Sequence, residues 1–288
     1  MVSRRVQSYQ NKIAKLRAFS QTLGLVLTNL YYLHLRWLPF PVMNCYACPL
    51  ATFACPIGSL QFAIGAGGFF PFYLLGIILF SGLLFGRITC GWLCPFGFIQ
   101  DLLYKIPLKK KFRLPAFVSY GKYLFLLVFV LFLPILLHDP IFCKICPVGT
   151  MEAGIPWPIL EPSFRALLGW LYALKLTILV GIVILAIFTP RPFCKGMCPL
   201  GALLSFFNRF SFLRVQVKEE ACKKCALCAE PCPQGLMIYE DEGHPDCIGC
   251  MECKVCPAVE MKAGIPDRLL GGKKQSKTER ISDIQPKL

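Results

Sequence analysis

The sequence CGWLCPFG (residues 90–97) returns later in the chain as CKGMCPLG (residues 194–201), with both cysteines at the same spacing. Two further copies of Cys-Pro-x-Gly occur at CPIGSLQ (55–61) and CPVGTME (146–152). Proline is favoured at the first position of a helix, where its missing N–H has no helical partner. Each cysteine is therefore expected at the positive end of a helix dipole, which favours the thiolate that iron binds. Glycine lets the backbone approach a bulky group. We interpret Cys-Pro-x-Gly as a turn that ligates an iron–sulfur cluster.

The composition indicates a membrane protein. Hydrophobic residues make up 56% of the chain and charged residues 16%, with a mean hydropathy of +0.57, which is too apolar for an ordinary soluble protein. Four segments approach the roughly 20 residues that a helix needs to cross a bilayer. They are residues 19–38, 69–85, 120–137 and 166–188. The sequence therefore predicts an all-α membrane domain with four transmembrane helices.

The positions of Lys and Arg predict the orientation of these helices. They gather before the first segment and in the second loop: Arg4, Arg5, Lys12, Lys15, Arg17, Arg87, Lys105, Lys109, Lys110, Lys111 and Arg113. The first loop has none, and the third has Lys144 with Arg165 at its edge. By the positive-inside rule, both termini and the second loop are cytoplasmic. The N-terminus has no signal-peptide cleavage site, so we expect it to act as a membrane anchor. The net charge is +15. The basic residues lie at the predicted membrane edges, so this charge does not indicate nucleic-acid binding.

The C-terminal part carries two runs of four cysteines. CKKCALCAEPCP (222–233) has the C-x2-C-x2-C-x3-C-P spacing of bacterial ferredoxins, in which the fourth cysteine ligates the other cluster. CIGCMECKVCP (247–257) repeats it with a last gap that is one residue shorter. The predicted ligand sets are Cys222, Cys225, Cys228 and Cys256 for one [4Fe–4S] cluster, and Cys247, Cys250, Cys253 and Cys232 for the other. A zinc ribbon pairs distant C-x-x-C units and does not have this pattern.

The membrane segments and cysteines together indicate an internal duplication. Each half contains a helix, an outer Cys-Pro-x-Gly, a second helix and an inner C-x3-C-P. Parallel repeats are related by an axis along the membrane normal, which would bring the two halves' cysteines together. The inner group is Cys90, Cys94, Cys194 and Cys198. The outer group has five members, one more than a cubane needs: Cys45, Cys48, Cys55, Cys143 and Cys146. The sequence does not choose among these five. Structural thiols are the alternative at the inner group, and a disulfide with spare thiols is the alternative at the outer group.

The predicted domains are a basic N-terminus (1–18), the membrane domain (19–214, repeats 19–110 and 120–214), a small α+β two-cluster ferredoxin domain (215–262) and a polar tail (263–288). Three further side chains are candidate neighbours of a quinone or a cluster: Lys175, His34 and His138. An ionisable residue inside a membrane helix is a functional candidate. Lys175 could equally extend its stem outward to the interface, and we favour that interpretation here.

The C-x3-C-P pairs, the stretch NCYACPLATFACPIG (44–58) and the terminal two-cluster ferredoxin resemble the NapH-type membrane ferredoxins. These are related to the NosR-type and RdxA/CcoG-type membrane iron–sulfur proteins. The resemblance covers residues 15–262. It implies a multi-pass protein of the cytoplasmic membrane that passes electrons between a quinol pool or a soluble ferredoxin-like donor and a respiratory redox partner. It would then be a subunit of a quinol dehydrogenase or another membrane oxidoreductase complex. The alternative is an assembly factor that reduces a metal or a disulfide in a partner respiratory enzyme.

Overall fold

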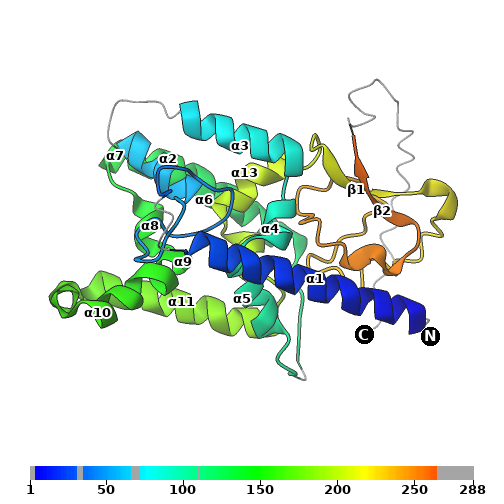
Figure 1. Ribbon diagram of the computed structural model, residues 1–288, viewed down its shortest axis with the longest axis horizontal. Helices are drawn as coiled ribbons and strands as arrows, with labels where there is room; N and C mark the ends of the chain where they lie inside the picture. Colours follow the sequence, from blue (N-terminus) through cyan, green and yellow to red (C-terminus); the bar gives the residue numbers. More distant parts are fainter. Residues whose placement is uncertain (1–3, 31–34, 66–71, 109, 265–288) are drawn as a thin grey trace.

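The computed structural model describes residues 4–30, 35–65, 72–108 and 110–264. Within these ranges the molecule is mostly helical and elongated, with a small two-stranded sheet at one end (Figure 1). Helices α1 (Arg4–Thr28), α3 (Phe72–Phe85) and α11 (Trp170–Phe188) run along the long axis. The end far from the sheet holds α8 (Ile141–Ile145) and α10 (Pro156–Leu160). His34 and the polar tail beyond residue 264 lie outside the described residues.

Each Cys-Pro-x-Gly copy begins a helix, as the sequence predicts. The proline is the first residue of the helix in every copy, and Cys94, Cys146 and Cys198 are the N-caps of three of them. The helices are α2 (Pro56–Gly65), α5 (Pro95–Tyr104), α9 (Pro147–Gly149) and α13 (Pro199–Phe207). A π-helical turn, η4 (Thr150–Gly154), continues α9. Three copies follow short helices: α4 (Ile88–Trp92), α8 and α12 (Pro192–Gly196).

The structure supports two of the four predicted membrane crossings. Among the described residues, only the helices Ala116–Leu137 and Trp170–Phe188 are long and apolar enough to cross a bilayer. Helix α3 has 14 residues, which is short for a crossing. Helix α1 begins at Arg4, well before the predicted segment, and ends at Thr28. The start of α1 is polar, so its apolar part is shorter than the predicted first span.

The helix Ala116–Leu137 changes its hydrogen-bonding pattern along its length. It consists of η2 (Ala116–Tyr120), α6 (Gly121–Phe125), the π-helical η3 (Leu126–Phe132) and α7 (Leu133–Leu137). Pro134 has no N–H to donate to the preceding turn, and the wide π segment lies directly before it. His138 ends the helix in a left-handed conformation, with φ of 50°.

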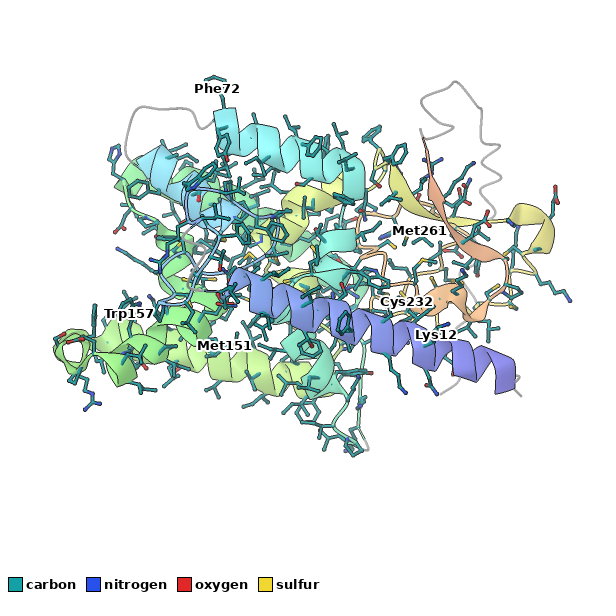
Figure 2. The ribbon with its side chains drawn as sticks, in the orientation of Figure 1. Lys12, Phe72, Met151, Trp157, Cys232 and Met261 are labelled. Atoms are coloured by element: carbon teal, nitrogen blue, oxygen red, sulfur yellow. The ribbon has the colours of Figure 1, made fainter. Side chains whose placement is uncertain are left out.

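The ferredoxin domain is built on the two-stranded sheet. Strand β1 (Leu213–Val217) pairs antiparallel with β2 (Val259–Ala263), with Leu213 opposite Ala263 and Val217 opposite Val259. The cysteine-rich loops lie between the strands and include two short 3-10 helices, η6 (Glu219–Ala221) and η7 (Glu252–Val255). Helix α1 reaches along the membrane domain to this end of the molecule (Figure 1). Figure 2 shows Cys232 on the ferredoxin side and Trp157 at the opposite end.

Candidate iron–sulfur sites

The eight ferredoxin cysteines gather into the two predicted sets. Cys228 lies near Cys222 and Cys256, and Tyr239 lies near the Cys222, Cys225 and Cys228 thiols. We call the set of Cys222, Cys225, Cys228 and Cys256 ferredoxin site 1. The other four cysteines line one small cavity together with Ile248 and Met251. We call Cys232, Cys247, Cys250 and Cys253 ferredoxin site 2. The short last gap of the second run therefore does not keep Cys256 away from its set.

The inner group forms what we call the central site: Cys90, Cys94, Cys194 and Cys198. All four side chains are buried in the same core cluster. The backbone N–H of Gly201 donates to Cys198 Sγ over 3.3 Å, and the Gln100 amide donates to Cys194 Sγ over 3.2 Å. Gln100 belongs to the first repeat and Cys194 to the second, so the two halves meet at this site. Donors of this kind stabilise a negatively charged sulfur.

Two arginines cross between the halves of the central site. Arg191 donates from Nη1 to the carbonyl of Cys90 over 2.8 Å, and Arg87 donates from Nη2 to the carbonyl of Cys194 over 3.3 Å. Both side chains are fully buried. A Cβ atom on Gly97 would lie 3.3 Å from the Arg191 guanidinium carbon, and one on Gly201 would lie 3.1 Å from Arg87 Nη2. At the central site, these glycines therefore make room for the arginine of the other repeat.

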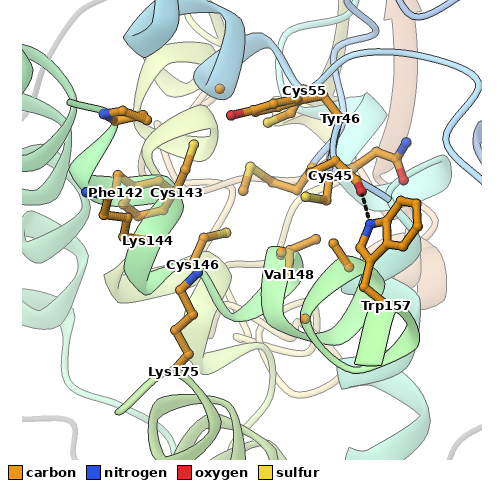
Figure 3. A pocket seen from close by; sticks show the side chains of 18 of the residues that line it. Cys45, Tyr46, Cys55, Phe142, Cys143, Lys144, Cys146, Val148, Trp157 and Lys175 are labelled. Atoms are coloured by element: carbon orange, nitrogen blue, oxygen red, sulfur yellow. Dashed lines mark hydrogen bonds between the residues drawn. The ribbon is translucent and has the colours of Figure 1, made fainter. Parts of the chain in front are cut away.

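The outer group surrounds a cavity of about 370 Å³ at the other end of the membrane domain (Figure 3). Four of its five cysteines line this cavity: Cys45, Cys55, Cys143 and Cys146. We call these four the distal site. A Cβ atom on Gly149 would lie 3.4 Å from Cys45 Sγ, and one on Gly58 would lie 3.6 Å from Cys143 Sγ. Here the Cys-Pro-x-Gly glycines do bring the backbone close to the sulfurs.

Cys48 is the fifth outer cysteine and is placed apart from the cavity. Its side chain is buried, and its Sγ lies 3.7 Å from the side-chain oxygen of Asn29, which directly follows α1. Its carbonyl accepts from the Arg36 guanidinium over 3.4 Å. These contacts suit a structural thiol that holds the loop against α1. The sequence left open which four of the five outer cysteines gather, and the structure places Cys48 outside the cavity that the other four line.

Lys175 extends into the cavity and not outward, contrary to the interpretation that we favoured from the sequence. It lines the distal cavity and its charge acts on Cys143. Figure 3 shows it reaching toward Cys146. His138 is an exposed residue whose Nδ1 lies 3.3 Å from the carbonyl of Gly65, and it does not line the cavity. The cavity continues past the sulfurs along Trp157, whose indole N–H donates to the Ala47 carbonyl over 2.7 Å.

Glu152 is a buried carboxyl group beside the distal site. Its Oε2 accepts from the backbone N–H of Cys45 over 2.5 Å, whereas its Oε1 has no partner among the described residues. Burial raises the pKa of Glu152 to about 7, and the Cys45 N–H acts in the opposite direction. Glu152 holds the Cys45 loop from the second repeat, so it links the two halves at the distal end.

Burial, and not the helix N-terminus, dominates the thiol pKa values. It raises the pKa of Cys94 to about 12, with the Cys194 and Cys90 thiols adding to the rise and backbone N–H groups opposing it. Burial likewise raises the pKa of Cys55, against the N–H groups of Gly58 and Ile57. The N–H groups at the helix start lower the thiol pKa, as the sequence predicts, but burial has the larger effect at these sites. A bound metal centre supplies the positive charge that keeps a buried thiol deprotonated.

The donor sets fit [4Fe–4S] clusters better than single metal ions. No group of three or more His, Cys, Asp or Glu side chains in the described part of the chain converges on a single-ion position. Each thiolate of a cubane binds a different iron, so its four sulfurs need not meet at one point. All 17 cysteines fall within described residues and are free thiols. Four all-cysteine sets, buried or half-buried except for Cys225, are the ligands that such clusters take.

The comparisons with known proteins support 4Fe-4S binding by the part of the chain that holds Cys90, Cys94, Cys143, Cys146, Cys194 and Cys198. The 4Fe-4S binding domain family matches residues 66–115, 123–159 and 173–216. The chain is 34% identical to the uncharacterized protein MJ0750 of Methanocaldococcus jannaschii over 62% of its own length and 72% of that protein. The chain belongs to the same family as MJ0750.

Other relatives are matched over a smaller share of their own length. The chain is 29% identical to the regulatory protein NosR of Stutzerimonas stutzeri, over 72% of the chain and 28% of NosR. It is 29% identical to the methylamine utilization ferredoxin-type protein MauN of Paracoccus denitrificans, over 58% of the chain and 56% of MauN. No solved structure matches the chain significantly. The chain thus spans about a quarter of NosR and about half of MauN.

The ferredoxin domain of this family member packs directly on the central site. The Trp92 indole N–H donates to the Gly249 carbonyl over 3.0 Å. Arg17, on α1, pairs with Asp101 and with Glu252, which lies between two ligands of ferredoxin site 2. Arg17 and Arg87 were counted from the sequence as signals of membrane topology. Both are buried in ion pairs, so they report the docking of the ferredoxin domain instead.

Gly91 packs tightly against the ferredoxin loop. A Cβ atom there would lie 2.3 Å from the Ile248 carbonyl oxygen. Gly91→Ala should therefore push the ferredoxin loop off α4 and destabilise the fold by about 1–3 kcal/mol, as overpacking usually does. Hydrogen exchange should be faster in residues 246–250. Gly181→Ala is the control, since nothing lies within 4 Å of its Cβ position. Unchanged exchange in the Gly91 variant would contradict this packing.

Proposed function

We propose that the chain is a NapH-type integral membrane protein that transfers electrons through four [4Fe–4S] clusters. The observation that carries this proposal is the order of the cysteine sets along the molecule. Ferredoxin site 2 packs on the central site through Ile248 and Cys250, which share a core cluster with Cys90 and Cys94. The same core cluster continues to Cys55 and Cys146 of the distal site. Cys228 of ferredoxin site 1 shares a second core cluster with Cys253 of ferredoxin site 2. The four sets therefore form one series from the ferredoxin domain to the distal cavity.

A [4Fe–4S] cluster supplies reversible one-electron transfer when bound. The chain's residues determine where these centres are held and how they are solvated. The buried thiols of the central site exclude water from it, and the Gln100 and Gly201 donors stabilise sulfur charge. The proposed ligands of the membrane domain are Cys90, Cys94, Cys194 and Cys198 at the central site, and Cys45, Cys55, Cys143 and Cys146 at the distal site.

The surface of the membrane domain supports a four-helix arrangement in the lipid. Helix α3 exposes large apolar side chains to the surroundings, including Phe72, Leu79 and Phe80. Helix α1 exposes Phe19 and Leu23 in its later half. We propose that these helices lie in the membrane beside Ala116–Leu137 and Trp170–Phe188, with both termini in the cytoplasm. Outside a membrane, these exposed apolar side chains would be in contact with water, which is unfavourable.

The distal cavity is the proposed point of exchange with a redox partner or a quinol. Its lining combines apolar side chains such as Phe142 and Leu168 with Tyr46, Tyr172 and Lys175. Mostly apolar cavities with a few polar groups are typical of small-molecule sites. The proposed partners are a quinol pool or a ferredoxin-like donor on one side and a respiratory enzyme on the other.

Iron analysis tests this function. Anaerobically purified protein should hold about 16 irons per chain, at four for each cubane. The double variant Cys94→Ser, Cys198→Ser should lose about four of them, with a matching loss of labile sulfide. The control is Ser59→Ala, which changes a residue outside the four cysteine sets and should retain all of the iron. A count of about eight irons that does not change in the cysteine variant would confine the clusters to the ferredoxin domain and refute the proposal.

A further inference from the structure

The central site is enclosed by a reciprocal exchange of arginines between the two repeats. Arg87 lies three residues before Cys90, and Arg191 lies three residues before Cys194. Each guanidinium leaves its own repeat and binds the cysteine carbonyl of the other, as Arg191 does at Cys90 and Arg87 at Cys194. The distal copies lack this feature, because no arginine lies three residues before Cys45, Cys55 or Cys143.

We propose that Arg87 and Arg191 form a cationic clamp that raises the reduction potential of the cluster held at the central site. This inference rests on the proposed function, because it needs a cluster there. The two arginines act as positioning residues: they bind the ligand loops and place two positive charges beside the four thiolates. We refer to them together as the arginine clamp.

The contacts of Arg191 fix its charge in place. Its Nε and Nη2 donate to the two carboxylate oxygens of Asp101 over 2.7 and 2.6 Å, which leaves Nη1 for the Cys90 carbonyl. A bidentate pair of this kind is both strong and geometrically specific. The charge of Arg191 also acts on Cys194 and on Cys250 of ferredoxin site 2. Arg191 therefore lies between the two sites.

Arg87 makes weaker contacts with its carboxylate partner than Arg191 does. Its Nη1 donates to the Pro245 carbonyl over 3.0 Å and lies 3.4 Å from Asp246, which also pairs with Lys122. Its Nε is buried without a partner among the described residues. Arg87 makes one contact of 3.4 Å with Asp246, whereas Arg191 binds Asp101 through two short hydrogen bonds, so Arg87 is the less neutralised half of the clamp. Its charge acts on Cys90, Cys198 and Cys194.

The sign of the effect follows from the charge of the cluster. A [4Fe–4S] core with four thiolates is anionic, and reduction adds one more negative charge. A buried cation stabilises the reduced form more than the oxidised form, and the low dielectric of the site strengthens this interaction. Net charge and hydrogen bonding near the sulfurs are known to set cluster potentials. Loss of Arg191 leaves Asp101 paired with Arg17 alone, and loss of Arg87 leaves Asp246 paired with Lys122 alone, so the local net charge becomes more negative in either variant.

The test is a potentiometric titration of the full-length protein, followed by electron paramagnetic resonance. Arg191→Gln and Arg87→Gln should each lower the midpoint of the central cluster, which is identified by its absence from the Cys94→Ser, Cys198→Ser variant. A tenfold or larger change in the ratio of reduced to oxidised cluster is expected at a fixed potential, which is 59 mV or more for one electron. Arg191→Lys and Arg87→Lys retain the charge and should stay nearer the wild-type midpoint. Arg209→Gln is the matched control, because Arg209 is half exposed and pairs with Asp241 on the surface.

Each outcome decides the question. Glutamine variants with wild-type iron and an unchanged midpoint would overturn the clamp and leave the proposed function intact. If the glutamine variants lose about four irons, the lysine variants decide the question. Retention of the central cluster in the lysine variants supports a requirement for positive charge. Loss of the cluster in the lysine variants shows that only the shape of the side chain matters and overturns the proposal. A wild-type count of about eight irons would instead refute the proposed function itself.

Discussion

Cys45→Ser should remove the distal cluster and about four irons from the protein, whereas Cys48→Ser should remove none. The two residues are three positions apart in one loop, so the pair is a closely matched comparison. Cys45 lines the distal cavity, and its Sγ is the nearest atom to the Cβ position of Gly149 in the opposite repeat. Cys48 does not line the cavity, and its thiol lies near Asn29. Serine at position 48 keeps a donor for that contact.

The measurement is iron and labile sulfide per chain, together with the electron paramagnetic resonance signal of the distal cluster. Cys143→Ser should reproduce the Cys45 result, because Cys143 belongs to the other repeat and lines the same cavity. The opposite result, loss of iron in the Cys48 variant alone, would mean that this loop rearranges when the cluster binds. Retention of all iron in both variants would show that the distal cysteines hold no cluster.

The sequence was sufficient wherever covalent geometry alone determines the local structure. Proline fixes the first turn of a helix, so the cysteine before it becomes the N-cap, as at Cys94 and Cys198. The ferredoxin spacing likewise predicted which cysteines would gather, including Cys232 with the second run. These features depend on neighbours in the chain, and no tertiary information is needed to infer them.

The sequence was insufficient wherever burial decides the role of a residue. Arg87 and Arg17 were read as markers of a cytoplasmic loop, but both lie in the interior, where they pair with carboxylates. The equal spacing of Arg87 and Arg191 before Cys90 and Cys194 was visible and could have revealed the clamp. No spacing rule could have shown that Lys175 turns into the distal cavity, because the side chain can reach either direction from its helix.

The helix boundaries show a similar limit. Hydropathy predicted a first span over 19–38, yet α1 begins at Arg4. Its early residues are polar, and the helix contacts the ferredoxin domain through Ile13 and Arg17. Arg17 and Ser20, near the middle of α1, bind the Gly91 and Trp92 carbonyls. Because α1 contacts two domains, it combines polar and apolar turns. A hydropathy window chosen for membrane spans therefore misses where this helix begins.

Asp246→Ala should strongly destabilise the protein, by about 3–5 kcal/mol, because removal of one partner leaves buried charges uncompensated. Asp246 pairs with Lys122 and Arg87, whose side chains are 0% and 1% exposed. It also joins the ferredoxin loop to the membrane domain, since it immediately precedes Cys247. The measurement is the urea midpoint in detergent, followed by the visible absorbance of the bound clusters. Glu260→Ala is the control, because its pair with Lys218 is exposed and should leave the midpoint unchanged.

A second substitution separates charge from packing. Lys122→Met in the Asp246→Ala background removes one of the two stranded cations and should recover part of the lost stability, because an apolar side chain of similar length tolerates burial. If the cost came from lost packing of the aspartate side chain, the second change would instead add to the loss. A wild-type midpoint for Asp246→Ala alone would mean that water reaches Lys122 and Arg87. The ferredoxin domain would then be held to the membrane domain mainly by the backbone contacts at Gly91 and Trp92.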